Sequence, residues 1–487
     1  MPEPRRTEPS RFRFRKKERE VEGLSVSLKE RLLGLLQSDP VVNGVVALAI
    51  TVGFFHGWLK IRFPGPATTF FFDALLCVAL VLTYFKQGRN ESFMPEGPVG
   101  NALKMFYLVC FIYLLLPMGV PAIIGLAAMR GWCFATLMFC LGYKLTKSVR
   151  QVKSYFYVLI ILGLVTAVYG LQQTPQEVDH EMEENPLFAE RYQFTYYHTS
   201  KGRQLRIFST FVSSGAFAGT MAYVAIFALA MATDKKTGKT ERILLFLVTA
   251  PIAYAMLKSG ARSALISFAI GFAVIAWYRR NLMNLVVLPL AVVLVLKLVA
   301  LHTGGSATER FQSLLKFEEV YYRISIPTSV GWRHMSDDNW FGGGIGRSGH
   351  SVPMFLAQKV KFRDYWPADG DLGRLMIEMG VIGLIAFGTV MYRSLRLVYN
   401  SLETLRDTEV STVSLASGGC VVMAIITIPS GSPFLGIPMG ALVWFFVGTL
   451  QKLTAEYEKG TLEGVAMDPE PGPDRSKIFR NRRFVRK

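Results

Sequence analysis

Two arginines stand directly beside apolar stretches of the sequence. Arg206 opens the run Arg-Ile-Phe-Ser-Thr-Phe, and Arg262 lies in Lys258-Ser-Gly-Ala-Arg-Ser, just before another apolar run. A guanidinium stays charged at any working pH and binds phosphate oxygens through two parallel hydrogen bonds. A single arginine in such a place could equally extend to lipid headgroups or pair with an acid. Arg206 and Arg262 together, with Lys258 beside them, favour a site for a phosphate ligand.

A later polar segment contains two more arginines and a glycine-rich run. Arg323 and Arg333 lie ten residues apart, and Trp340 opens Trp-Phe-Gly-Gly-Gly-Ile-Gly. This run lacks the strand, helix and ribose-binding acid of a dinucleotide fold. It is expected to form a tight turn, or to let the backbone approach a ligand closely. Arg323 and Arg333 are candidates for positioning phosphate or sugar, and Trp340 for stacking on a sugar ring.

Acidic residues open a further apolar run, in the sequence Asp369-Gly-Asp371-Leu. A carboxylate whose pKa is raised by burial can act as a general base toward a hydroxyl group. Two alternatives stay open for this pair of acids. Asp-x-Asp also suits Mg²⁺ or Mn²⁺, as does Asp337-Asp338, and Asp371 could simply cap the helix that follows.

Long apolar helices must position these residues. Hydrophobic residues make up 51% of the 487 residues, charged residues make up 18%, and the mean hydropathy is +0.31. A helix of about 18 apolar residues can cross a membrane, because it satisfies its own backbone hydrogen bonds. We expect about twelve spans, at Val41–Leu59, Ala67–Phe85, Ala102–Met118, Ile123–Tyr143, Tyr155–Leu171, Phe208–Met231, Ile243–Met256, Ala264–Tyr278, Leu282–Leu301, Leu375–Met391, Val413–Ile428 and Phe434–Leu450.

The placement of lysine and arginine predicts how these spans are oriented. With the N-terminus in the cytoplasm, nearly every basic cluster falls on the cytoplasmic side, as the positive-inside rule requires. The expected fold class is an all-α polytopic membrane protein with one large and one medium loop on the outer side. Its predicted parts are a cytoplasmic basic N-terminal tail (1–40), a transmembrane part (41–452) with outer loops 172–207 and 302–374, and a cytoplasmic basic C-terminal tail (453–487).

The net charge of +18 raises the question of nucleic acid as a partner. The basic residues lie in tails and short loops without interleaved aromatic residues, which favours contact with anionic lipids instead. The five cysteines all lie in apolar segments and lack the spacing of a metal site or a disulfide framework. We therefore expect no nucleic acid and no cysteine-bound metal.

Four stretches of the chain, taken in order, resemble the O-antigen ligase and polymerase superfamily of bacterial membrane glycosyltransferases. They are residues 206–215, 259–263, 323–346 and 369–383. The resemblance extends to the twelve-span layout and the large late outer loop. It implies transfer of a glycan from undecaprenyl diphosphate at the outer, periplasmic face of the bacterial inner membrane. Neither a nucleotide sugar, a metal nor another cofactor is implied.

The resemblance also implies roles for individual residues. Arg206 and Arg262 would hold the diphosphate and stabilise its charge as it leaves. The family commonly opens its last motif with a histidine placed to activate the acceptor hydroxyl. Here Asp369 has that position, so Asp369 is the leading candidate for the base, with Asp371 and His350 behind it. This departure favours a polysaccharide polymerase or a divergent relative over the lipid A-core ligase.

The expected function is therefore glycan transfer in O-antigen (lipopolysaccharide) or exopolysaccharide biosynthesis. The expected partners are an undecaprenyl-diphosphate-linked donor, a glycan or lipid acceptor, membrane lipids and envelope polysaccharide assembly proteins. A transporter or flippase for lipid-linked sugars is the alternative, and it predicts charged residues near the middle of the spans. A structural partner in an envelope complex is the third possibility.

Overall fold

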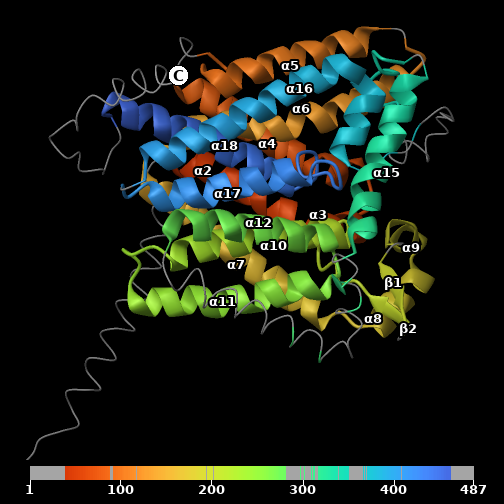
Figure 1. Cartoon of the computed structure of the whole chain (residues 1–487), viewed down its shortest axis with the longest axis horizontal. Helices are drawn as coiled ribbons and strands as arrows, with labels where there is room; N and C mark the ends of the chain where they lie inside the picture. The colour runs from red at the N-terminus through yellow and green to blue at the C-terminus, as the bar shows by residue number, and fades with distance from the viewer. Residues whose placement is uncertain are drawn as a thin grey trace, which may run out of the picture.

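The protein is a bundle of long helices, described here by a computed structural model (Figure 1). Most helices lie side by side along the bundle. The structure describes residues 39–87, 92–116, 118–192, 195–200, 202–280, 297, 301, 309, 311–312, 316–337, 339–349, 366, 368, 370–406 and 408–461.

A described helix overlaps each predicted span except 282–301, but several helices begin or end some residues away from the predicted bounds. The elements are α2 (Pro40–Phe54), α3 (His56–Arg62), α4 (Pro66–Gln87), α5 (Pro98–Leu115), α6 (Ala122–Leu145), α7 (Val149–Gln172), α8 (Pro175–Glu184), α9 (Pro186–Tyr192), β1 (Tyr196–Thr199), β2 (Gly202–Leu205), α10 (Ser214–Ala232), α11 (Lys239–Lys258), α12 (Arg262–Arg279), α15 (Phe317–Ser336), α16 (Asp371–Thr404), α17 (Ser411–Thr427) and α18 (Met439–Lys459).

Seven of the described helices are long and apolar enough to cross a membrane: α4, α5, α6, α7, α10, α11 and α16. The bent pair α2–α3 would make an eighth span. The coarse prediction of a helical multi-pass membrane protein is therefore supported. The predicted span 282–301 lies almost wholly outside the described residues.

Close helix packing forms the centre of the bundle. Helix α10 is almost entirely buried and contacts α7, α11, α12 and α17. Its sequence is rich in alanine and glycine, and small residues let helix backbones approach closely. A second close contact joins α6 to α18. A methyl group added at Gly142 would collide with the backbone of Phe445, and one added at Gly448 with the backbone of Phe139.

The basic connections meet at one end of the bundle, which we call the basic end. Side chains join the start of α2 to α4 and α7, and join α7, α10, α12 and α17 to one another. Several lysine and arginine side chains there pair with an acid or a hydroxyl group, and an amide pair joins α7 to α2. The contacts are Lys86–Asp39 (2.6 Å), Gln151–Asn43 (3.2 Å), Lys153–Asp234 (3.7 Å), Lys236–Glu409 (2.8 Å) and Arg279–Thr412 (2.7 Å).

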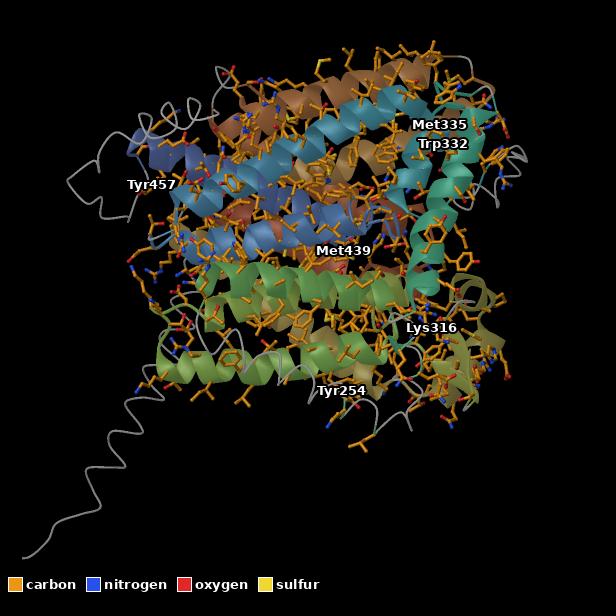
Figure 2. The ribbon with its side chains drawn as sticks, viewed as in Figure 1. Tyr254, Lys316, Trp332, Met335, Met439 and Tyr457 are labelled. Atoms are coloured by element: carbon orange, nitrogen blue, oxygen red, sulfur yellow. The ribbon has the colours of Figure 1, made fainter. Side chains whose placement is uncertain are left out.

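The opposite end, the loop end, carries the remaining elements. The predicted outer loop 172–207 forms α8, α9 and the antiparallel hairpin β1–β2, so the expected all-α fold has one small hairpin. The predicted outer loop 302–374 contains α15, which runs across the ends of the other helices in Figure 1. Figure 2 labels Lys316, just before this helix, and Met335, near its end.

The first predicted span, 41–59, is not one straight helix. The chain bends by 70° between α2 and α3, and the segment 208–213 lies against the break. The hydroxyl of Thr210 donates to the carbonyl of Phe54 at 2.7 Å, and the N–H of Trp58 donates to the carbonyl of Thr210 at 3.0 Å. The inserted segment therefore satisfies backbone groups that the broken helix leaves without helical partners.

The predicted span Phe208–Met231 begins later than expected, because α10 starts at Ser214. Side-chain hydrogen bonds hold residues 208–213 out of the helix. The side-chain carbonyl of Gln173 accepts the N–H groups of Phe208 (3.1 Å) and Ser209 (2.8 Å). Ser209 also has a positive φ of 54°. Apolar content alone could not reveal this irregular stretch.

The glycine-rich run after α15 forms a turn that closes on α16. Helix α16 is interrupted at Gly380, where φ is 54° and ψ is −144°. Only glycine adopts this backbone conformation readily. Backbone groups of the turn replace the helical bonds lost at the interruption. The bonds are Gly343 N to Ile377 O (2.8 Å), Gly344 N to Glu378 O (3.0 Å) and Val381 N to Trp340 O (2.9 Å).

Replacing Gly380 with alanine should therefore unfold this junction. An added Cβ would lie 2.2 Å from the carbonyl oxygen of Trp340, in a backbone conformation that alanine avoids. We expect a loss of at least about 2 kcal/mol in stability, measured as a lower thermal unfolding midpoint of the purified protein in detergent. Gly388→Ala is the matched control, because the same helix leaves open space there. Equal midpoints for both variants would contradict the turn.

Candidate functional site

Arg206 joins two of the motifs found in the sequence. Its backbone N–H donates to the carbonyl of Thr195 at 2.7 Å, which fixes it just after the β1–β2 hairpin. Its side-chain Nε donates to the carbonyl of Ser259 at 3.2 Å. The structure thus brings Arg206 to the turn that contains Lys258 and leads into Arg262.

The turn between α11 and α12 holds the other two cations. Gly260 has a positive φ of 64°, and the hydroxyl of Ser259 accepts the N–H of Ala261 at 3.2 Å. Lys258 donates from Nζ to the carbonyl of Leu171 at 3.3 Å, near the end of α7. Arg262 is the first residue of α12 and is half-buried.

These contacts place the side chains of Arg206 and Lys258 at the C-terminal ends of two helices. The carbonyls of Leu171 and Ser259 lie at the C-terminal ends of α7 and α11, where the helix dipole is negative and favours cations. Arg206 and Lys258 are thus positioned by backbone carbonyls, and Arg262 begins the helix that follows the same turn. Guanidinium and ammonium groups placed together in this way have the chemistry that recognises phosphate.

Asp371 has a structural partner. It is the first residue of α16, and Gly370 occupies the cap position, so the alternative that Asp371 caps the helix is wrong. Its side chain is 1% exposed and accepts the backbone N–H of Phe434 at 3.0 Å. Its own N–H donates to the carbonyl of Gly431 at 3.0 Å. Asp371 therefore fastens the turn after α17 to the start of α16.

A buried polar face follows Asp371 on α16. Arg374 and Glu378 are 4% and 0% exposed, and their spacing places all three side chains on one helix face. The carboxylate of Glu378 accepts the indole N–H of Trp132 at 2.7 Å and the hydroxyl of Ser348. The guanidinium of Arg374 lies 5.6 Å from the ring centroid of Trp132. Glu378 thus ties α6 and the glycine-rich turn to α16.

His334 lies next to this face on α15. Gly331, one turn earlier, contacts α16 at Gly373 and Met376. The imidazole of His334 is 2% exposed, its Nδ1 finds no hydrogen-bond partner among the described residues, and its ring meets Trp366 edge-on at 5.1 Å. An imidazole buried in this way favours its neutral form.

The arginine group and the polar face belong to the same end of the bundle. Arg279 at the end of α12 bonds Thr412 at the start of α17, so these packed helices are antiparallel. Arg262 therefore lies level with the end of α17. The turn after α17 bonds the start of α16 through Gly431 and Asp371. Both groups lie at the loop end.

The other predicted site residues are placed less fully. Arg333 is exposed on α15, and Trp340 is 46% exposed and meets Trp332 edge-on at 5.9 Å. Arg323 lies within α15, but its side chain is outside the described residues, as are Asp369 and His350. Asp338 is also outside them. Within the described residues, no three histidine, cysteine or acidic side chains form a group that could hold a metal ion.

Sequence reasoning missed most of the buried polar face. Glu378 and Arg374 were visible as charges inside or beside an apolar run, a signal that predicts a buried partner. Trp132 and Ser348 gave no such signal, because neither residue type is unusual in its position. Their proximity to Glu378 comes only from folding.

No protein-family model matches this chain, and no curated protein matches it. The class that the fold defines is a helical membrane protein with several spans. The resemblance to the O-antigen ligase and polymerase superfamily stays a hypothesis that the geometry can support or weaken.

His334 should make stability depend on pH. Burial lowers the pKa of His334 below its usual value, the charge of Arg347 lowers it further, and Asp337 opposes both. The unfolded chain, with a pKa of about 6.5, then binds the proton more readily than the folded protein. The stability that the neutral imidazole contributes is therefore fully present above about pH 6.5. It is lost as the pH falls through the lower pKa of the folded protein.

When the pH is lowered from about 7.5 to about 5, the thermal unfolding midpoint of His334→Gln should fall less than that of the native protein. Thermal unfolding in detergent at both pH values measures this difference. His180→Gln is the control, because that side chain is 71% exposed, and its pH response should equal the native one. An unchanged response in His334→Gln would show that the buried imidazole does not titrate as described.

Proposed function

We propose that the protein is a membrane glycosyltransferase of the O-antigen ligase or polymerase type. It transfers a glycan from a lipid diphosphate to a sugar hydroxyl at the loop end of the bundle. The observation that carries this proposal is the meeting of Arg206 with the Lys258–Arg262 turn, through the bond to Ser259. Arg206 and the Lys258–Arg262 turn are far apart in the sequence, and their meeting gathers cations of the kind that bind a lipid-borne diphosphate.

The proposed chemistry uses this group to stabilise the leaving charge. The acceptor oxygen forms a bond to the anomeric carbon, and the bond from that carbon to the diphosphate oxygen breaks. The diphosphate leaves with the electron pair, and its growing negative charge is stabilised by guanidinium groups already in place. The hydroxyl proton passes to a base, for which Asp369 remains the leading candidate. Asp371 is less suited, because its carboxylate accepts the N–H of Phe434.

The proposal includes an orientation. The basic end would face the cytoplasm, with both termini, and the loop end would face the periplasm of a bacterial inner membrane. The donor would be an undecaprenyl-diphosphate-linked glycan of O-antigen or exopolysaccharide biosynthesis. Membrane lipids and envelope assembly proteins would be its neighbours.

Arg206→Ala and Arg262→Ala should each lower glycan transfer by about 100-fold or more, because each removes a charged donor from the leaving group. The measurement is made in cells that lack the native gene and carry the variant. Finished polymer should fall, and lipid-linked glycan should accumulate, as measured by mass spectrometry of lipid extracts.

Arg203→Ala is the matched control. This arginine lies on the nearby hairpin, pairs with Asp179 at 3.2 Å and stacks on Tyr196, so its loss should leave transfer within about twofold of normal. Normal transfer by both Arg206→Ala and Arg262→Ala would refute the diphosphate site.

One observation favours the transporter alternative. Asp73 on α4 and Arg130 on α6 form an ion pair inside two apolar helices. Charged residues within spans are costly and often mark transport pathways. The pair is neutral as a unit, however, and Arg130 also donates to the carbonyl of Thr69 at 3.4 Å. These contacts equally describe a link that fastens α4 to α6.

A double variant distinguishes the transferase from the transporter. Asp73→Asn alone should cost about 3 kcal/mol, because it leaves Arg130 charged and unpaired. Asp73→Asn combined with Arg130→Gln should recover part of that loss. A transferase should keep glycan transfer in the double variant, whereas a transporter that uses the pair should lose lipid-linked sugar movement in reconstituted vesicles. If the double variant is stable but no longer moves lipid-linked sugar across the vesicle membrane, the transporter is favoured.

A further inference from the structure

A cleft of about 500 Å³ opens at the loop end, between α3, the end of α7 and α8. Its volume lies within the range of small-molecule sites. Trp58 and Arg62 line it from α3, Tyr169 and Gln172 from α7, and Glu181 from α8. The cations Arg206, Lys258 and Arg262 do not line it, so it is separate from the proposed diphosphate site.

One wall of the cleft is a rigid aromatic stack. The rings of Tyr192 and Phe208 are stacked with centroids 4.0 Å apart, and Phe188 lies 4.6 Å from Tyr192. The hydroxyl of Tyr192 donates to the carbonyl of Phe211 at 2.6 Å. All three rings are at least nine-tenths buried. This wall is therefore formed before any ligand binds, which lowers the entropic cost of binding.

The exposed lining has the chemistry that recognises a saccharide. Trp58 and Tyr169 are 42% and 45% exposed and offer aromatic faces for the C–H groups of a sugar ring. Gln172 and Glu181 are exposed. The amide of Gln172 can donate hydrogen bonds to hydroxyl groups and accept them, and the carboxylate of Glu181 can accept them.

The charge of the cleft argues against an anionic ligand. Of the described residues that line the cleft, Arg62 is basic, and Glu177 and Glu181 are acidic. An excess of negative charge disfavours phosphate and anionic lipid headgroups. A neutral, polyhydroxylated ligand fits this lining best.

We propose that this cleft binds the neutral glycan of the lipid-linked donor. This inference rests on the proposed function, because it assigns a second part of the same substrate. Phe208 lines the cleft two residues after Arg206, and Gln172 follows Leu171, whose carbonyl holds Lys258. The same two segments therefore support the cleft and the cation group. A diphosphate held by the cations places its attached sugar beside the cleft.

The test uses the full-length protein in detergent on an array of neutral bacterial oligosaccharides, followed by titration of the best-retained one. Trp58→Ala combined with Tyr169→Ala should weaken binding by about tenfold or more, because both aromatic faces are lost. Glu181→Gln should weaken it less. Trp277→Ala combined with Tyr399→Ala is the matched control, since these residues are 73% and 66% exposed outside the cleft; it should bind normally.

The outcomes separate this inference from the transferase. Free oligosaccharide carries no phosphate, so Arg206→Ala should still bind it while losing transfer. Cleft-dependent binding together with normal transfer by Arg206→Ala and Arg262→Ala would support the cleft and refute the diphosphate site. The cleft proposal fails if no oligosaccharide distinguishes the native protein from the Trp58→Ala, Tyr169→Ala variant. It also fails if that variant loses only binding to phosphatidylglycerol vesicles.

Discussion

Irregular backbone inside an apolar bundle has to find hydrogen-bond partners, and this requirement shapes the whole loop end. Two stretches of irregular backbone in this protein have this requirement. The segment 208–213 meets it by bonding to the broken ends of α2 and α3 and to the side chain of Gln173. The glycine-rich turn meets it by replacing helical bonds at Gly380. Each insertion also carries polar side chains into a place that a regular helix would have left apolar.

The two insertions position the two parts of the candidate site. Arg206 enters immediately before segment 208–213 and reaches Ser259, so the first insertion fixes the cation group. The glycine-rich turn brings Ser348 to Glu378, so the second fixes the buried face of α16. The proposed transferase depends on both, because the leaving group and the acceptor would have to meet between them. Side chains held by packed backbone can stabilise a developing charge without reorganising.

Hydropathy predicted where most of the long helices lie, since membrane helices carry their own hydrogen bonds and a continuous apolar signal. Seven of the described helices, or eight with the bent pair, are long and apolar enough to span, whereas about twelve spans were expected. Hydropathy did not predict the bend after Phe54, because most residues on both sides of the break are apolar, although His56 lies at the break itself. Helix α15 lies inside a segment expected to be a loop, because its apolar residues are too few for a span. The pairing of Arg206 with Ser259 and of Glu378 with Trp132 is long-range in sequence, and no local pattern encodes it.

The contact between α6 and α18 has a consequence for how the chain matures. The glycine positions Gly142 and Gly448 bring the two backbones together, yet most of the chain separates them. During synthesis α6 is made long before α18, so this face of α6 has no native partner until α18 is made. The contact between the two backbones can therefore form only after α18 has been made, and a protein shortened before α18 would leave this face of α6 open to chaperones and membrane proteases.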